Sequence, residues 1–107
     1  MTSTPFQRTL TLPASLCEEA VEHLEKAAQR TVDGAGIPLK AFRAAADDDY
    51  TLPVSVVEQA ANCLLVLATE TAQTARPSAL RATIGVALRL RDAVEALHQP
   101  ALTTRYW

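Results

Sequence analysis

The sequence predicts an all-α protein built as one small domain. Twenty alanines and fourteen leucines dominate the apolar residues, whereas valine occurs eight times and isoleucine twice, a composition that favours helices over strands. Hydrophobic residues make up 49% of the 107 residues, enough to fill one core. Apolar residues also recur at helical spacing over most of the chain. We therefore expect a short extended arm, an amphipathic helix, a short helix and a long antiparallel helical hairpin within residues 1–107.

The first half of the chain predicts an arm and two helices. Residues 1–13 predict an extended arm, because polar and apolar residues alternate before Pro13 ends the pattern. Residues 15–30 predict an amphipathic helix with one apolar stripe. After a glycine-containing loop, residues 39–46 predict a short helix, which the aspartates at 47–49 close.

The second half predicts a helical hairpin. Residues 55–75 and 78–97 each show helical periodicity, and Pro77 separates them because proline ends one helix and can begin the next. The connection is so short that the two helices must run antiparallel. Residues 100–107 form a tail.

We expect the hairpin to carry more apolar surface than one chain can cover, because residues 59–69 are uncharged and large apolar side chains surround most of the helix there. We expect a second copy of the chain to cover it, giving a homodimer with a four-helix-bundle core. The alternative is a monomer in which the helix at 15–30 does all the covering. The residues expected to be shared between core and interface are Leu64, Leu65, Leu67, Ile84, Leu88 and Leu90.

One segment of the first half recurs in the second. Residues 11–24 match residues 51–64 at seven positions, beginning with Thr-Leu-Pro in both. In each copy a serine stands three residues before a glutamate, the pattern of a capping box at a helix N-terminus. The pairs are Ser15 with Glu18 and Ser55 with Glu58. Either two helices begin by the same chemistry, or the chain contains a repeat.

The charge is near balance but unevenly distributed. The net charge is −2, which disfavours strong non-specific phosphate binding. Residues 18–58 carry nine acidic and four basic residues, and residues 76–105 carry five basic and two acidic ones. Such opposite charges either pair the chain's own helices or steer a partner.

The sequence contains no strong catalytic or metal-binding motif. Two cysteines and two histidines, Cys17, Cys63, His23 and His98, are its soft or imidazole ligands, and none stands at the spacing of a zinc site. The cysteines lie in apolar surroundings, where a free cysteine behaves as a small buried hydrophobe, so we expect no structural disulfide. We therefore predict no enzyme, no metal and no cofactor.

The N-terminus resembles a known family of DNA-binding proteins. A polar and apolar alternation that ends at Pro13, followed directly by an amphipathic helix, is similar to the start of ribbon-helix-helix repressors of the Arc/MetJ class. In that family two such strands pair across a dimer and enter the major groove. The resemblance covers residues 7–30; beyond them, the three aspartates depart from the expected phosphate grip. It implies base contacts by Gln7, Thr9 and Thr11, and a dimer core containing Leu10 and Leu12.

These observations favour a small non-enzymatic regulator that acts by protein–protein interaction, for example an antiactivator or inhibitor that holds a transcription factor or an enzyme inactive. The alternative is a DNA-binding transcriptional repressor of the ribbon-helix-helix type, and a third reading is a helical subunit of a larger assembly. The first residues lack a signal-peptide pattern and no apolar stretch is long enough to cross a bilayer, so we expect a cytoplasmic protein without membrane contact. No residue identifies the partner protein.

Overall fold

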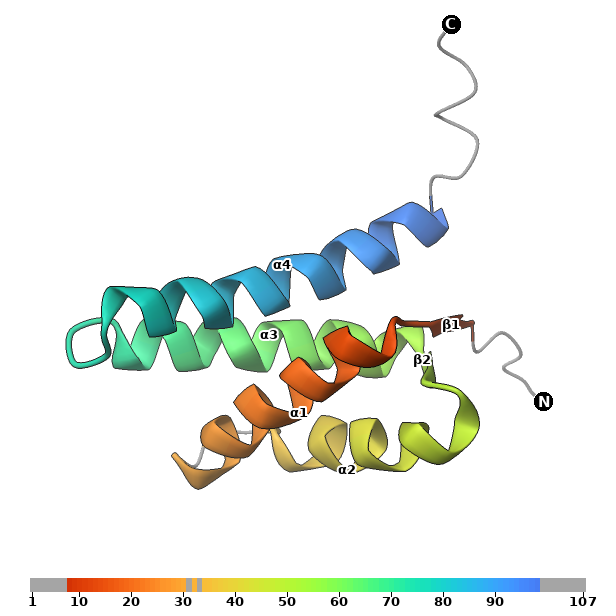
Figure 1. The fold of residues 1–107 in the computed structure, drawn as a ribbon, viewed down its shortest axis with the longest axis horizontal. Helices are drawn as coiled ribbons and strands as arrows, with labels where there is room; N and C mark the ends of the chain where they lie inside the picture. The colour runs from red at the N-terminus through yellow and green to blue at the C-terminus, as the bar shows by residue number, and fades with distance from the viewer. Residues whose placement is uncertain (1–7, 31, 33, 99–107) are drawn as a thin grey trace, which may run out of the picture.

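The chain folds as an all-α protein, as its composition and periodicity predict. The computed structural model describes residues 8–30, 32 and 34–98 (Figure 1). Within these residues the chain forms four α-helices, two short strands and one 3₁₀ turn. In chain order the elements are β1 (Thr9–Thr11), α1 (Ala14–Gln29), α2 (Gly36–Ala45), η1 (Ala46–Asp48), β2 (Thr51–Pro53), α3 (Val54–Thr71) and α4 (Pro77–His98).

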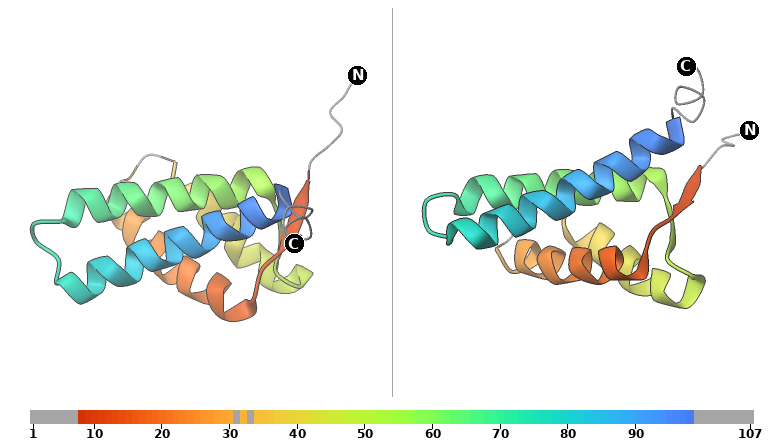
Figure 2. Two further views of the ribbon diagram at one scale, coloured as in Figure 1. Left: turned by 90° about the horizontal axis from the view of Figure 1, so that it is seen from above. Right: turned by 45° about the horizontal axis from the view of Figure 1, so that its top comes forward.

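The helices form two layers around one core. The antiparallel hairpin of α3 and α4 makes one layer, and α1 and α2 make the other (Figure 2). Large side chains from all four helices and from β2 are fully buried between the layers, which removes their apolar surface from water. They include Leu24, Phe42, Leu52, Val57, Leu64, Val86 and Leu90.

The expected N-terminal arm contains a strand, and that strand has a partner within the same chain. β1 pairs antiparallel with β2, with Leu10 opposite Leu52 and Thr11 opposite Thr51. β2 is not predicted by the sequence, because three residues are too few to show a strand period. The inward side chain of β2, Leu52, is 1% exposed, so the short ribbon covers one end of the core.

The pairing shows that the recurring segment marks two similar structural units. Each begins with a strand, continues through a proline into a long helix and ends with a second helix: β1–α1–α2 and β2–α3–α4. The register pairs equivalent residues, Thr11 with Thr51, and their hydroxyl oxygens lie 2.9 Å apart within hydrogen-bonding distance. An approximate local two-fold axis therefore passes through this threonine pair.

The two expected capping boxes do not form. The residues before α1 and α3 are Pro13 and Pro53, with ψ of 141° in both cases, and neither helix has a side-chain cap. Ser15 and Ser55 lie one residue inside the helices instead. The physical reason is that each strand is followed by a proline with extended backbone angles immediately before the helix. The fixed φ of proline already suits the turn into the helix. The first α1 hydrogen bond runs from the Cys17 N–H to the Pro13 carbonyl, 3.1 Å.

The short helix begins earlier than the sequence predicts. α2 starts at Gly36, so Pro38 lies in its first turn, where a missing N–H breaks no helical hydrogen bond. After η1, Asp49 and Tyr50 adopt left-handed backbone angles, with φ of 55° and 58°. The Tyr50 N–H donates to the Ala45 carbonyl at 2.8 Å, which turns the chain back into β2.

The hairpin turn is longer than the sequence predicts, because α3 ends at Thr71 and not at Ala75. The hydroxyl of Thr71 donates to the Leu67 carbonyl at 2.8 Å, a side-chain bond that competes with continued helix. The Ala75 N–H then donates to the Thr71 carbonyl at 2.8 Å. Residues 72–76 therefore form the turn before α4.

We predict that Ser55→Ala destabilises the fold by less than about 0.5 kcal/mol, the usual range for an exposed substitution away from special features. Loss of a capping serine would instead cost about 1 kcal/mol. The free energy of unfolding in urea measures the difference. As a control in the same ribbon-to-helix segment, Leu52→Ala should cost about 2–5 kcal/mol because it leaves a cavity in the core. A loss of about 1 kcal/mol at Ser55 would show that it caps α3 in solution.

Candidate functional site

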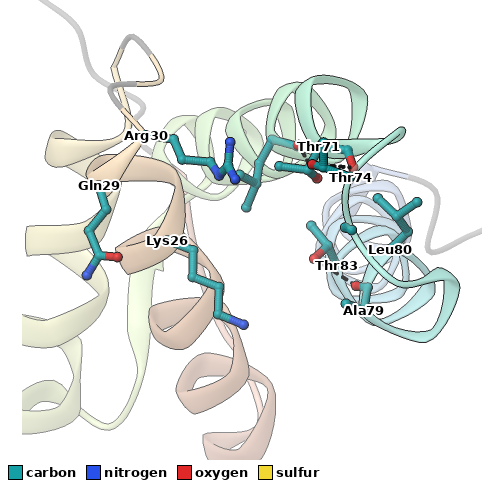
Figure 3. A pocket seen from close by; sticks show the side chains of 10 residues that line it. Lys26, Gln29, Arg30, Thr71, Thr74, Ala79, Leu80 and Thr83 are labelled. Atoms are coloured by element: carbon teal, nitrogen blue, oxygen red, sulfur yellow. Dashed lines mark hydrogen bonds between the residues drawn. The ribbon is translucent and has the colours of Figure 1, made fainter.

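The hairpin carries an apolar strip on the side that faces away from α1 and α2. We call this strip the outer face; it consists of Leu65, Val66, Ala72, Ile84 and Leu88, together with Leu80, which at the turn end also borders a pocket lined by α1 (Figure 3). Val66, Ile84 and Leu88 are 43%, 38% and 49% exposed. Such exposure of large apolar side chains, gathered on two adjacent helices, is typical of an interaction surface.

The structure divides the six residues expected at the interface into two groups. Leu64, Leu67 and Leu90 are buried within their own chain, at 0%, 4% and 0% exposure. Leu65 is half-buried, and Ile84 and Leu88 are exposed. Three of the six residues are therefore placed where a partner could contact them.

Helical spacing explains the division. On α3, Leu64 and Leu67 lie on the side that packs on the core, whereas Val66 lies on the opposite side. Val66 was not among the expected interface residues. The signal for it is present in the sequence, because Asn62 and Thr69 stand four before and three after it and mark a polar side of the helix.

A groove runs between α3 and α4 on the outer face. It has a volume of about 380 Å³ and is lined by Leu65, Ala68, Thr69, Ala72, Leu80 and Ile84. The Thr69 hydroxyl donates to the Leu65 carbonyl at 2.9 Å, so the polar side chain among them is already hydrogen-bonded. The groove therefore offers mainly apolar contact.

Charged residues frame the outer face at both ends. Near the ribbon, Glu58 at the start of α3 and Glu95 near the end of α4 are exposed. At the turn end, Arg81 on α4 is exposed. The ribbon end also carries exposed Arg91 and Asp92, and the turn end also carries exposed Glu70 and Arg76. Summed over these residues, the ribbon end is net acidic and the turn end net basic.

The residues that would read DNA lie on the ribbon or outside the described chain. Thr9 and Thr11 are exposed on β1, and the Thr11 hydroxyl bonds with that of Thr51. Gln7 and the tail at 100–107 lie outside the described residues. Of the two leucines expected in a dimer core, Leu12 is buried in its own chain at 3% exposure and Leu10 is half-buried.

His23 is a buried polar residue between α1 and α4. Its Nδ1 lies 3.1 Å from the Thr83 hydroxyl, within hydrogen-bonding distance. Burial lowers the pKa of His23, and the neighbouring cations of Lys26 and Arg89 lower it further, while Glu22 and Glu19 act in the opposite direction. The neutral imidazole therefore serves as a hydrogen-bonding contact between two helices.

The cysteines are buried thiols and not reactive ones. Burial raises the pKa of Cys17 to about 11, with a further contribution from Glu18, and burial also raises the pKa of Cys63. Both are free of disulfides. Within the described part of the chain, no group of three His, Cys, Asp or Glu side chains is placed to hold a metal ion.

Comparison of the chain with protein-family models, with curated proteins and with solved structures gave no match. None of the helices within residues 8–30 and 34–98 combines the length and the apolar character needed to cross a membrane. The candidate site therefore rests on the geometry and chemistry of the outer face.

We predict that acidification destabilises the fold through His23. Because the pKa of folded His23 lies below its ordinary value of about 6.5, the unfolded chain takes up this proton at a higher pH than the folded chain. The stability that neutral His23 contributes is complete above about pH 6.5 and declines as the pH falls below it. Urea unfolding on both sides of that pH measures the change.

The matched control for this prediction is His23→Gln, which keeps a polar side chain but cannot titrate. Its free energy of unfolding should fall less over the same pH interval than that of the wild-type protein. The interval should stay above pH 5. Arg89 lowers the pKa of Glu19 in the folded protein, so below that pH the unfolded chain would begin to take up a proton at Glu19 as well as at His23. Equal pH dependence of the two proteins would contradict the role of His23.

Proposed function

We propose that this chain is a small cytoplasmic regulatory protein that acts by binding other proteins and does not catalyse a reaction. It forms a homodimer through the outer face, and the dimer holds a target protein, such as a transcription factor or an enzyme, inactive. The observation that carries the proposal is the exposed apolar strip on α3 and α4, with Ile84 and Leu88 at its centre. An apolar patch of this kind on a surface marks a place where another protein binds.

The charges around the outer face favour a second copy of this chain as the occupant. A two-fold axis that lies in the plane between two outer faces, perpendicular to the helix axes, would bring the outer faces of two copies together with their hairpins in opposite directions. Arg81 of each copy would then face Glu58 and Glu95 of the other, because the basic turn end meets the acidic ribbon end. Two hairpins joined in this way form a four-helix bundle.

Gly85 supports the same occupant. It lies in the middle of α4 next to Ile84, and a Cβ added there would meet nothing within 4 Å. A glycine inside a helix costs about 1 kcal/mol relative to alanine. Nothing within the described chain requires this glycine, whereas a helix of a second copy could approach α4 closely at that point.

We predict that Leu88→Glu weakens self-association by at least about a hundredfold, because each copy would carry a charge into the apolar interface. Sedimentation velocity over micromolar concentrations measures the dimer fraction. The monomer fold should persist, since Leu88 is 49% exposed. Ala44→Glu, an exposed position of α2 in the other layer, is the matched control and should leave the dimer unchanged.

The orientation of the dimer has its own check. Arg81→Glu should weaken association, and a second change, Glu58→Arg, should restore it by reversing both charges of the pair. A wild-type protein that sediments as a monomer throughout the range would overturn the dimer. Association that Leu88→Glu leaves unchanged would show that another surface is used.

The regulatory role is tested by capture followed by reconstitution. A protein retained from the native cytoplasm is purified, and its own activity is measured with increasing amounts of this chain. We expect the wild-type chain to inhibit the captured protein stoichiometrically. A variant chain that no longer binds the captured protein should not inhibit it. A captured protein whose activity stays constant at saturation contradicts the proposed role.

The ribbon supports a second candidate function, DNA binding of the ribbon-helix-helix type. β1 and β2 form an antiparallel two-stranded ribbon with Thr9 and Thr11 exposed, and a long helix follows each strand. Here one chain supplies both strands, so the ribbon is complete without a second copy. The exposed aspartates at 47–49 precede β2 and would repel phosphates, which ranks this candidate second.

If the ribbon reads DNA, a mobility-shift titration on the promoter of the chain's own operon should show a complex that added salt weakens. Thr9→Ala and Gln7→Ala should each weaken it by about fivefold to a hundredfold, the loss of one base contact. Ser55→Ala, an exposed substitution outside the ribbon, serves as the control. Absence of a shift at low salt would remove this candidate.

A further inference from the structure

The ribbon leaves one edge of β1 without a partner strand. The Leu12 N–H donates to the Tyr50 carbonyl at 3.0 Å, so the backbone groups of Leu12 lie on the side of β2. The bonds of an antiparallel pair involve every second residue of a strand, and the register places Leu10 in the same set as Leu12. The backbone N–H and C=O groups of Thr9 and Thr11 therefore face away from β2. Within the described part of the chain, no backbone group bonds to them.

The opposite edge of the ribbon is less suited to a further strand. The outward residues of β2 are Thr51 and Pro53, and a proline has no N–H to donate. Proline at an edge position protects a sheet from additional strands. β1 contains no proline, so its edge presents both the donors and the acceptors that an extended segment can pair with.

An apolar groove lies beside the open edge of β1. It has a volume of about 580 Å³ and is lined by Thr9, Leu10, Thr11, Ala93, Ala96 and Leu97. A strand added to β1 would place every second side chain against the α4 residues of this lining. The groove therefore supplies apolar contact to a strand whose inward side chains are apolar. None of the lining residues belongs to the outer face.

The chain leaves α4 beside this groove. α4 ends at His98, one residue beyond the lining residue Leu97 (Figure 2). The local two-fold axis accounts for this position, because it relates β1 to β2 and α4 to α2. The chain leaves α2 close to β2 and, by the same relation, leaves α4 close to β1.

The sequence after α4 has the composition of a strand, although these residues lie outside the described chain. Pro100 cannot continue a helix. Residues 102–107 read Leu-Thr-Thr-Arg-Tyr-Trp, in which threonine, tyrosine and tryptophan favour strands. In an extended segment Leu102 and Tyr106 share one side, which is uncharged, and Arg105 lies on the other. One side of such a segment therefore suits an apolar groove.

We propose that residues 101–107 bind in this groove as a third strand beside β1. The segment pairs with the backbone groups of Thr9 and Thr11 and places Leu102 and Tyr106 against the end of α4. Its attachment to α4 favours it over a separate peptide, because a short connection gives it a roughly millimolar local concentration. In this position it also closes the open edge of β1 to strands from other chains.

Hydrogen exchange of individual amides, measured by NMR on the full chain, tests the pairing. Thr9 and Thr11 should exchange at least about tenfold more slowly in the wild-type chain than in Leu102→Glu, which brings a charge into the groove. Thr103→Glu adds the same charge on the opposite side of the segment and should leave their exchange unchanged. The Leu10 amide, which faces β2, should stay protected in all three proteins and reports that the ribbon is intact.

A change in the groove provides an independent check. Ala96→Glu, at an exposed lining residue, should release the segment and speed the exchange of Thr9 and Thr11, whereas Ala44→Glu, at an exposed position of α2, should not. Exchange of Thr9 and Thr11 in the wild-type chain at the rate of unprotected amides would overturn the proposal. So would protection that Leu102→Glu or Ala96→Glu leaves intact, or protection that increases with protein concentration, since a second copy would then occupy the edge.

Discussion

The pairing of β1 with β2 is the contact on which the arrangement of the helices depends. It joins two segments forty residues apart, Thr11 with Thr51, and places the starts of α1 and α3 side by side. Both strands end in a proline with extended backbone angles, so both helices leave the ribbon from equivalent positions. Leu52 then lies at one end of the core that the two layers enclose.

The core of this alanine-rich chain is filled by small and large side chains together. α1 and α3 contribute Ala20, Ala60 and Ala61 to the interior, all at 0% exposure. Small side chains at these positions allow the helix backbones to approach closely, and interiors must be closely packed to be stable. The larger side chains, such as Leu64 and Leu90, fill the space between the layers.

The presence of the four helices could be predicted from the sequence, because the spacing of the apolar residues shows which side chains lie on one side of a helix. The start of each helix could not be predicted with the same accuracy. Ser15 and Ser55 have the spacing of capping residues, yet the ribbon makes Pro13 and Pro53 the residues before the helices. A contact between distant strands overrides a local pattern here.

The candidate site was predictable only in part, for a related reason. An apolar stretch such as Cys63–Leu67 shows that α3 needs cover on several sides, but it does not show which side the chain itself covers. Leu64 and Leu67 are in the core, and Val66 is outside. The direction of α3 is set by its position against α1, α2 and α4, which depends on tertiary contacts.

The uneven charge of the chain is used partly within the fold. Glu19 and Glu25 on α1 form ion pairs with Arg89 on α4 and Arg43 on α2, the first at 2.7 Å. Both pairs are exposed, so they guide how the helices meet more than they stabilise the fold. The pair of Glu19 and Arg89 joins α1 to α4 across the two layers, and the pair of Glu25 and Arg43 joins α1 to α2 within one layer.

Of the other charges on the hairpin, Glu58, Glu95 and Arg81 lie beside its outer face, where the described part of the chain supplies no partner helix. Glu58 and Arg81 stand at opposite ends of that face and are too far apart along the hairpin to pair with each other, since the turn end and the ribbon end are separated by the length of α3. In the proposed dimer, a second copy in the opposite direction would place Arg81 of one chain near Glu58 of the other and would cover Ile84 and Leu88. The same asymmetry that orders the helices within the chain therefore also selects the direction in which two chains would meet.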